Sequence, residues 1–291
     1  MKKYSKEKLK AKRGIKVIII ILSIIAVACI AVLLFSLFSK KIIFERIDSS
    51  ASNVSNDVAS NSTPIIVNNL ILGATYDKKW VASEKYYLNS KNGENSEVDA
   101  YSKDGKMGKY NIGKISKDTK TASIYTTISK QNLLNEYFAI ATSNNNAMST
   151  PATKINNIDE SYIKDVKKTL GMYRIFNMSV KITEVYDIVL SDLEKGYIIF
   201  ATNEVNKGKG AYSAIVYVSS TGKSKLIKYN YINNKDNAEE WPIYSLNFVA
   251  DLNQDGTSEI LLQETKEFEV KYDVIEYKNN NFYEIMSSVV K

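Results

Sequence analysis

A run of oxygen-bearing side chains between residues 251 and 259 has the residue types and the spacing of a cation site. The run reads Asp-Leu-Asn-Gln-Asp-Gly-Thr-Ser-Glu, with side-chain oxygens at its first, third, fifth and ninth positions. Calcium prefers several oxygen ligands, and a tight loop with oxygens at alternate residues brings them to one point. Gly256 allows the positive φ that such a bend needs. We therefore predict a calcium loop, against the alternative of a metal-free polar turn held by side-chain hydrogen bonds.

The residues around this run predict a strand–loop–strand unit and exclude an EF-hand. In an EF-hand the twelfth position supplies a bidentate Glu, whereas here that position is Leu262. Apolar residues precede the run at 248–250 and follow it at 260–262. We expect calcium in such a hairpin to stiffen the loop and to take no part in catalysis.

Residues 248–262 resemble the calcium loop of FG-GAP (integrin-like) repeats and related VCBS-type surface proteins. That pattern is Asp-x-Asp/Asn-x-Asp-Gly-x-x-Asp/Glu followed by an apolar strand, and here it occurs once, which implies a single loop without a propeller. The resemblance implies that Thr257 contributes a backbone carbonyl to calcium. It also implies four side-chain ligands: Asp251, Asn253, Asp255 and Glu259.

Two absences limit the other chemistry that the chain can perform. The sequence contains no His, and its single Cys is Cys29. Nucleophile systems built on His and zinc sites built on His or Cys are therefore excluded. Carboxylate catalysis stays open at Glu239-Glu240-Trp241-Pro242, where a solvated loop is the alternative to a glycosidase cleft. A tyrosine-lined groove is a further hypothesis for Tyr86, Tyr87, Tyr229 and Tyr231.

Residues 17–38 form an uncharged apolar segment of membrane-spanning length. A helix of this length spans roughly 33 Å, close to the ~30 Å hydrocarbon core of a bilayer. The segment has no polar face, which a water-exposed helix would need. We predict a single uncleaved transmembrane helix. The alternative is a lipoprotein signal in which Cys29 is acylated, but the residues after Cys29 remain apolar.

The distribution of charge predicts the orientation of this helix. Of the 39 basic and 32 acidic residues, eight basic and one acidic lie in residues 1–16, which leaves 31 of each sign in residues 17–291. The basic flank stays in the cytoplasm. We therefore expect a cell-membrane protein with a cytoplasmic N-terminus and an extracytoplasmic C-terminal part. Nucleic acid is not an expected partner, because residues 17–291 carry no net positive charge.

The remaining chain divides into a stalk and two β-rich parts. Residues 39–64 are predicted to be a Ser/Asn-rich stalk, since such composition buries too little apolar surface to fold. Short β-type segments separated by turn signals, one of them over 80–88, predict a small β barrel or sandwich over 65–150. Residues 151–291 predict a helix at about 159–170, with Asp159 as N-cap, followed by an antiparallel β meander that carries the Asp-rich loop. The predicted fold class is thus mainly β.

Together these features predict a membrane-anchored binding protein of the bacterial cell surface rather than an enzyme. Its expected partners are the bilayer through residues 17–38 and a cell-wall polymer or another envelope protein. Two alternatives stay open. One is a carboxylate-dependent hydrolase of cell-wall glycan, and the other is an envelope assembly factor that acts through its transmembrane helix.

Overall fold

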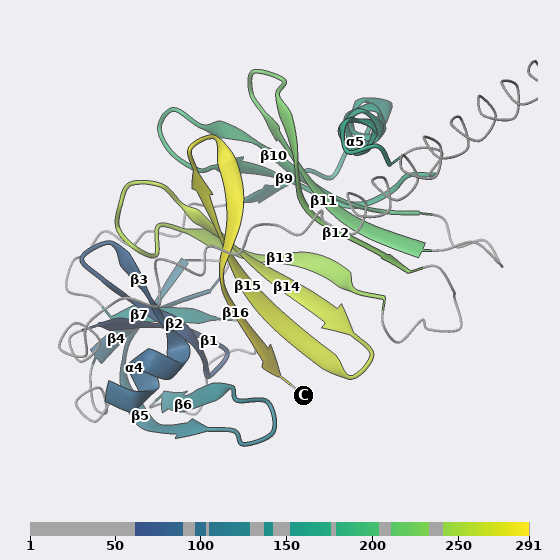
Figure 1. Cartoon of the computed structure of the whole chain (residues 1–291). Coiled ribbons are helices and arrows are strands. Elements are labelled where there is room, and N and C mark those ends of the chain that lie inside the picture. Colours follow the sequence, from purple (N-terminus) through teal and green to yellow (C-terminus); the bar gives the residue numbers. More distant parts are fainter. Residues whose placement is uncertain are drawn as a thin grey trace, which may run out of the picture. The chain divides into compact units, whose positions relative to one another are not determined.

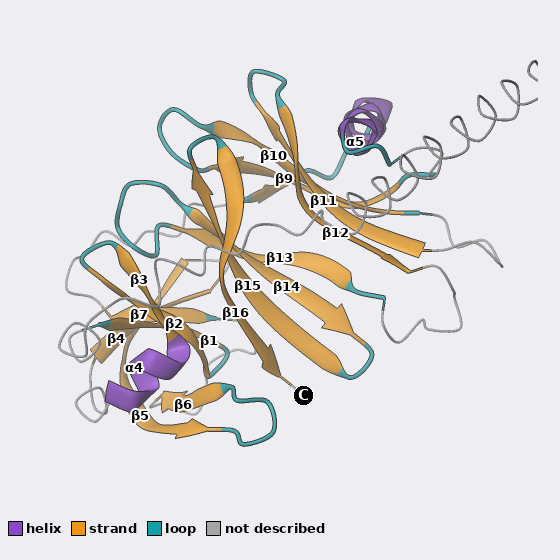
Figure 2. Ribbon diagram, in the orientation of Figure 1, coloured by secondary structure: helices purple, strands orange, loops and turns teal. Residues whose placement is uncertain are grey.

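The computed structural model describes residues 62–89, 97–102, 105–128, 137–141, 152–175, 179–203, 211–232 and 241–290. Figure 2 draws the other residues in grey. The predicted tail at 1–16, the predicted transmembrane segment at 17–38 and residues 39–61 of the predicted stalk lie outside the described residues. Within the part of the chain that the structure describes, no helix is both long enough and apolar enough to cross a membrane.

The prediction of a mainly β fold is confirmed, since the described residues form sixteen strands and two helices and every paired strand is antiparallel. The strands fall into three sheets (Figure 1). The first sheet contains β1 (Thr63–Val67), β2 (Leu70–Tyr76), β3 (Lys79–Ala82), β4 (Glu97–Ser102), β5 (Gly105–Lys117), β6 (Ile124–Ile128) and β7 (Phe138–Ala141). Because β1 begins at Thr63, the predicted stalk ends earlier than residue 64.

The first sheet closes on itself, because β1 pairs with both β7 and β2. The resulting ring runs β1-β7-β4-β5-β6-β2, and β3 extends it beyond β2. Alternate residues of a strand point to opposite faces of a sheet. Ile66 and Ile71 accordingly belong to one apolar cluster, while Ile65, Leu70 and Leu72 belong to another. The barrel therefore has a packed inner core and a second, outward-facing apolar surface.

A short helix, α4 (Ser83–Asn89), follows β3 where the sequence predicts a strand over 80–88. That prediction is wrong from Ser83 onward. Tyr86 lies on this helix, is 2% exposed and belongs to the inner cluster of the barrel. The helix thus contributes Tyr86 to the apolar interior of the barrel.

The second sheet consists of β8 (Thr153–Lys154), β9 (Lys181–Val189), β10 (Lys195–Thr202), β11 (Ala211–Ser219) and β12 (Ser224–Ile232), ordered 12-11-10-9-8. Helix α5 (Glu160–Met172) packs on one face through Val166 and Leu170. The predicted N-cap is confirmed, because the Asp159 side chain accepts a hydrogen bond from the Ser161 N–H at 2.7 Å. The helix ends at Met172, two residues later than predicted.

The third sheet is a meander of β13 (Ile243–Ala250), β14 (Glu259–Lys266), β15 (Glu269–Lys278) and β16 (Asn281–Val290). One of its faces joins the outer apolar surface of the barrel, with Phe248 and Val274 in the same cluster as Phe138. Its other face shares a cluster with the second sheet, where Leu262 lies with Phe200. The meander is therefore covered on both faces and takes part in two cores.

Candidate functional site

The predicted calcium loop connects β13 to β14, and Glu259 is the first residue of β14, directly opposite Ala250. Gln254 and Gly256 adopt positive φ values of 60° and 94°, which turn the chain sharply. Glycine suits the second of these positions because it has no Cβ. The strand–loop–strand arrangement predicted from the sequence is thus the one observed.

The side-chain oxygens of the loop accept hydrogen bonds from the backbone of the loop itself. Asp251 accepts from the N–H groups of Asp255 (3.1 Å) and Gly256 (2.9 Å). Asn253 accepts from the N–H of Asp255 at 3.0 Å, and Asp255 accepts from the N–H of Thr257 at 2.8 Å. Such bonds organise the turn, and each carboxylate oxygen keeps a further lone pair that a cation could use.

Glu259 is the loop residue whose environment most needs a positive charge. It is fully buried, and its Oε2 accepts a 2.8 Å hydrogen bond from the Leu252 N–H. Its Oε1 is buried without a hydrogen-bond partner. Burial raises the pKa of Glu259 well above its ordinary value, and Asp255 and Asp251 add to the rise. Burial likewise raises the pKa of Asp251.

No lysine or arginine among the described residues forms an ion pair with Asp251, Asp255 or Glu259. Three acidic side chains without a basic partner therefore converge here, which fits a divalent cation. In the same described ranges, no set of three or more His, Cys, Asp or Glu residues is grouped closely enough to form a metal centre on its own. A cation here would also need the oxygens of Asn253 and of the Thr257 backbone.

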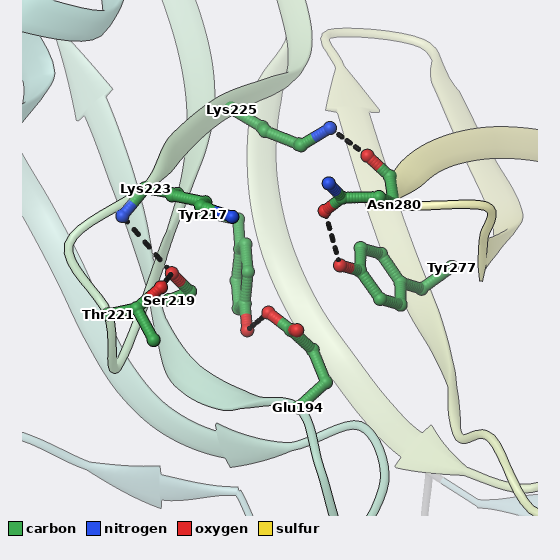
Figure 3. A pocket seen from close by; sticks show the side chains of 8 residues that line it. All are labelled: Glu194, Tyr217, Ser219, Thr221, Lys223, Lys225, Tyr277 and Asn280. Carbon is green, nitrogen blue, oxygen red and sulfur yellow. Dashed lines mark hydrogen bonds between the residues drawn. The ribbon is translucent and has the colours of Figure 1, made fainter.

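A pocket of about 140 Å³ lies where hairpin turns from the second and third sheets meet (Figure 3). Glu194 comes from the β9–β10 turn, and Asn280 comes from the β15–β16 turn. The other lining residues come from β11, β12, their connecting turn and β15: Tyr217, Ser219, Thr221, Lys223, Lys225 and Tyr277.

Hydrogen bonds fix the polar groups of the pocket (Figure 3). The Tyr217 hydroxyl donates to Glu194 Oε1 at 2.7 Å, and the Tyr277 hydroxyl donates to Asn280 Oδ1 at 2.9 Å. The Lys225 ammonium donates to the Asn280 backbone carbonyl. Burial, and then the hydrogen bond to Glu194, raise the pKa of Tyr217, so this hydroxyl remains a donor at neutral pH. The pocket thus presents a carboxylate, an amide, hydroxyls and two ammonium groups.

The loop and the pocket are joined through the β9–β10 turn. The Ser258 N–H donates to the Leu190 carbonyl at 2.6 Å. Within that turn, the N–H groups of Leu190 and Ser191 donate to the Glu194 carbonyl at 2.9 and 3.1 Å. Backbone hydrogen bonds therefore connect the loop to the turn that carries Glu194.

Among the described residues, the tyrosine candidates from the sequence do not line this pocket. Tyr86 is a core residue of the barrel, and Tyr229 stacks on Tyr212 with ring centroids 5.9 Å apart. Tyr231 is 42% exposed. Glu239 and Glu240 lie outside the described residues. The tyrosines that do line the pocket, Tyr217 and Tyr277, are separated in sequence and carry no local signal that would identify them.

The chain matches no family model, and it matches neither a curated protein nor a solved structure. The resemblance of residues 248–262 to FG-GAP loops therefore stays a prediction, and the chemistry of the site rests on its own residues.

Proposed function

We propose that the chain is a membrane-anchored, extracytoplasmic binding protein that holds a cell-wall glycan in the pocket bounded by Glu194, Tyr217 and Tyr277. The observation that carries this proposal is the pocket itself, to which three hairpin turns contribute; one of them, the β9–β10 turn, accepts a backbone hydrogen bond from Ser258 of the Asp-rich loop. The uncharged segment at 17–38 and the basic tail before it support the anchoring. The absence of His from the sequence supports binding over catalysis.

The chemistry of the pocket favours a hydroxylated ligand. A sugar offers hydroxyls that both donate and accept, and the pocket has the carboxylate of Glu194, the amide of Asn280 and the ammonium groups of two lysines to meet them. The half-buried Tyr277 ring offers an apolar surface for the C–H face of a sugar ring. A simple anion suits the pocket less well, because Glu194 would repel it.

Calcium has a structural part in this proposal. Asp251, Asn253, Asp255 and Glu259 would hold it, together with the Thr257 carbonyl. The ion would supply the positive charge that the buried Glu259 carboxylate lacks. By fixing the loop, it would also fix Ser258 and the turn that carries Glu194.

Thermal unfolding in calcium tests the metal part of the proposal. We expect the melting temperature of the full chain in detergent to rise on the order of 5 °C in millimolar calcium, since a ligand that binds only the folded state stabilises it. The double variant Asp251→Asn, Asp255→Asn should lose this rise. Asp118→Asn is the matched control, because Asp118 holds a turn through the N–H groups of Lys120 and Thr121. A melting temperature that calcium leaves unchanged would contradict the metal assignment.

Calorimetric titration with soluble cell-wall glycan fragments tests the binding part. We expect binding that Tyr277→Ala and Glu194→Gln each weaken by about tenfold or more, which corresponds to ~1.4 kcal/mol. Tyr231→Ala is the control, because Tyr231 is exposed and does not line the pocket. Fragments that bind equally well to all three variants would place the ligand elsewhere.

A further inference from the structure

Four charged side chains lie between the second and third sheets. Lys228 extends from β12, Lys271 and Asp273 from β15, and Glu284 from β16. The side chains of Lys228 and Asp273 are 9% and 0% exposed, and those of Lys271 and Glu284 are 22% and 23% exposed. An ammonium and a carboxylate are thus held together away from water at the junction of two sheets.

Each atom of this cluster has a defined neighbour. Lys228 Nζ donates to Asp273 Oδ2 and lies 2.9 Å from Glu284 Oε2. Lys271 Nζ lies 2.8 Å from Asp273 Oδ1, the other carboxylate oxygen, and 3.4 Å from Glu284 Oε1. Lys228 and Lys271 therefore each contact a different oxygen of the Asp273 carboxyl group, and Glu284 contacts both ammonium groups.

These positions are those that an amide-forming reaction requires. A lysine amine is a nucleophile once it has lost a proton, and a neighbouring carboxylate can accept that proton. A fixed positive charge stabilises the oxyanion that develops when a carboxyl carbon is attacked. Glu284 contacts the amine that must be deprotonated, and Lys271 contacts the oxygen that would become the oxyanion.

We propose that Lys228 and Asp273 join in an isopeptide bond, with Glu284 as the proton-transfer group and Lys271 as the oxyanion stabiliser. The Nζ–Cγ bond forms and the Cγ–Oδ2 bond breaks. Glu284 carries two of the three Nζ protons, one after the other, to Oδ2, which leaves as water. The ammonium and carboxylate become a neutral amide, so charge balances and no other reactant is needed.

The surroundings favour the amide over the ion pair. Removing two opposite charges from water carries a desolvation penalty that the Coulomb attraction does not always offset. Two further titratable side chains, Glu264 and Tyr244, interact electrostatically with members of the cluster. Burial tends to raise the pKa of Glu284, but the ammonium groups of Lys228 and Lys271 outweigh it and hold this pKa below its ordinary value. Glu284 is therefore ionised and able to accept a proton.

An isopeptide bond would supply a covalent cross-link that the cysteine content of this chain cannot provide. Cys29 is the only cysteine, so residues 62–290 cannot form a disulfide among themselves. A bond between Lys228 and Asp273 would covalently join the second sheet to the third, which belong to different stretches of the chain.

Mass spectrometry of the full chain, purified in detergent, tests the proposal directly. We expect its mass to be lower than the sequence mass by one water molecule. Trypsin cannot cleave after an acylated Lys228, so a branched peptide should join residues 226–235 to residues 272–278. Recovery of residues 226–228 and 272–278 only as separate, unmodified peptides would overturn the proposal, as would a branch at Lys271.

Three variants separate the chemistry from the fold. Lys228→Arg keeps the charge but cannot form the amide, and Glu284→Gln keeps the size of the side chain while removing the proton acceptor. Each variant should have the mass calculated from its own sequence, without the loss of one water molecule. Both should keep the circular dichroism spectrum of the chain without substitutions. Lys225→Arg, on the same strand, should keep the branch. A branch that persists in full in Glu284→Gln would overturn the role of Glu284.

Discussion

The buried side chain of Glu259 links the stability of the protein to pH and, in the proposed calcium loop, to the cation. Its carboxyl group is buried at the start of β14, with one oxygen bonded to the Leu252 N–H and the other without a partner. Without a cation, the folded state favours the protonated acid. With a cation, it favours the carboxylate. If the proposed calcium binds, the charge state of this side chain therefore depends on whether the loop is occupied.

A pH titration of stability measures this preference. The pKa of Glu259 is raised in the folded state, so its contribution to the free energy of unfolding is present below the ordinary carboxyl pKa and is lost as the pH rises toward the folded-state value. In a calcium chelator, we expect stability to fall above about pH 4.5, by up to ~1.4 kcal/mol per pH unit while this group alone titrates.

Denaturant titrations over a series of pH values test this expectation. Asp251 adds a trend of the same sign, because burial raises its pKa as well. Glu259→Gln should flatten the dependence, and calcium should stabilise the unmodified protein more at higher pH. An equally steep loss of stability in Glu259→Gln would assign the effect to other groups.

The hairpin of β9 and β10 depends on a glycine at the start of β10. A Cβ built on Gly196 would lie 2.2 Å from the Val218 carbonyl oxygen and 2.8 Å from Ser219 Cα, both on the neighbouring strand β11. Backbone atoms cannot move aside as the end of a flexible side chain can. Only glycine therefore lets β10 approach β11 at the position that leads into the pocket.

Gly196→Ala tests this close approach. We expect a loss of about 2–3 kcal/mol in the free energy of unfolding, as for other overpacked sites, together with weaker glycan binding. Gly222→Ala is the control, because a Cβ there meets nothing within 4 Å and only its φ of +78° is unfavourable. That variant should cost about 1 kcal/mol in denaturant titrations. Equal losses for the two variants would argue against the steric explanation.

The elements that could be predicted from the sequence are those with local signals. Helix α5 has an N-cap at Asp159 and apolar residues at helical spacing, and the loop between β13 and β14 is one contiguous motif. Helix α4 was missed because Tyr86 and its apolar neighbours have high strand propensity, which packing into the barrel overrides.

Pairings between distant segments of the chain cannot be predicted from local sequence patterns. Barrel closure pairs β1 with β7, and the pocket combines Glu194 with Asn280, so each unites segments far apart in the chain. Neither hydrophobic periodicity nor turn chemistry encodes which distant partners meet. The contiguous Asp-rich loop could therefore be found in the sequence, but the pocket could not.

At the scale of the whole described region, the third sheet unites the other two. Hydrogen bonds reinforce its contact with the barrel, since Trp80 Nε1 donates to Glu276 Oε1 at 3.0 Å and Asn68 Nδ2 donates to the Tyr272 hydroxyl at 2.9 Å. All the described residues fall within one compact unit of the chain. The barrel and the second sheet are therefore expected to unfold together.

Calorimetry of Phe248→Ala tests this coupling. Phe248 packs edge-on against Phe138 of the barrel, with ring centroids 4.7 Å apart, and is 4% exposed. We expect a loss of about 3–5 kcal/mol in a single transition, whose calorimetric and van't Hoff enthalpies agree. Two separated transitions in this variant would show that the barrel and the sheets are independent.

The shared position of β13–β16 also has a consequence for biosynthesis. The ribosome makes these strands after the barrel and after β8–β12, so a nascent chain that has reached only β12 carries two unfinished apolar surfaces. Neither surface can be covered until the last strands emerge. A premature stop codon ahead of β13 should therefore yield a product open to proteolysis along its whole length, and not a shortened protein with its earlier parts intact.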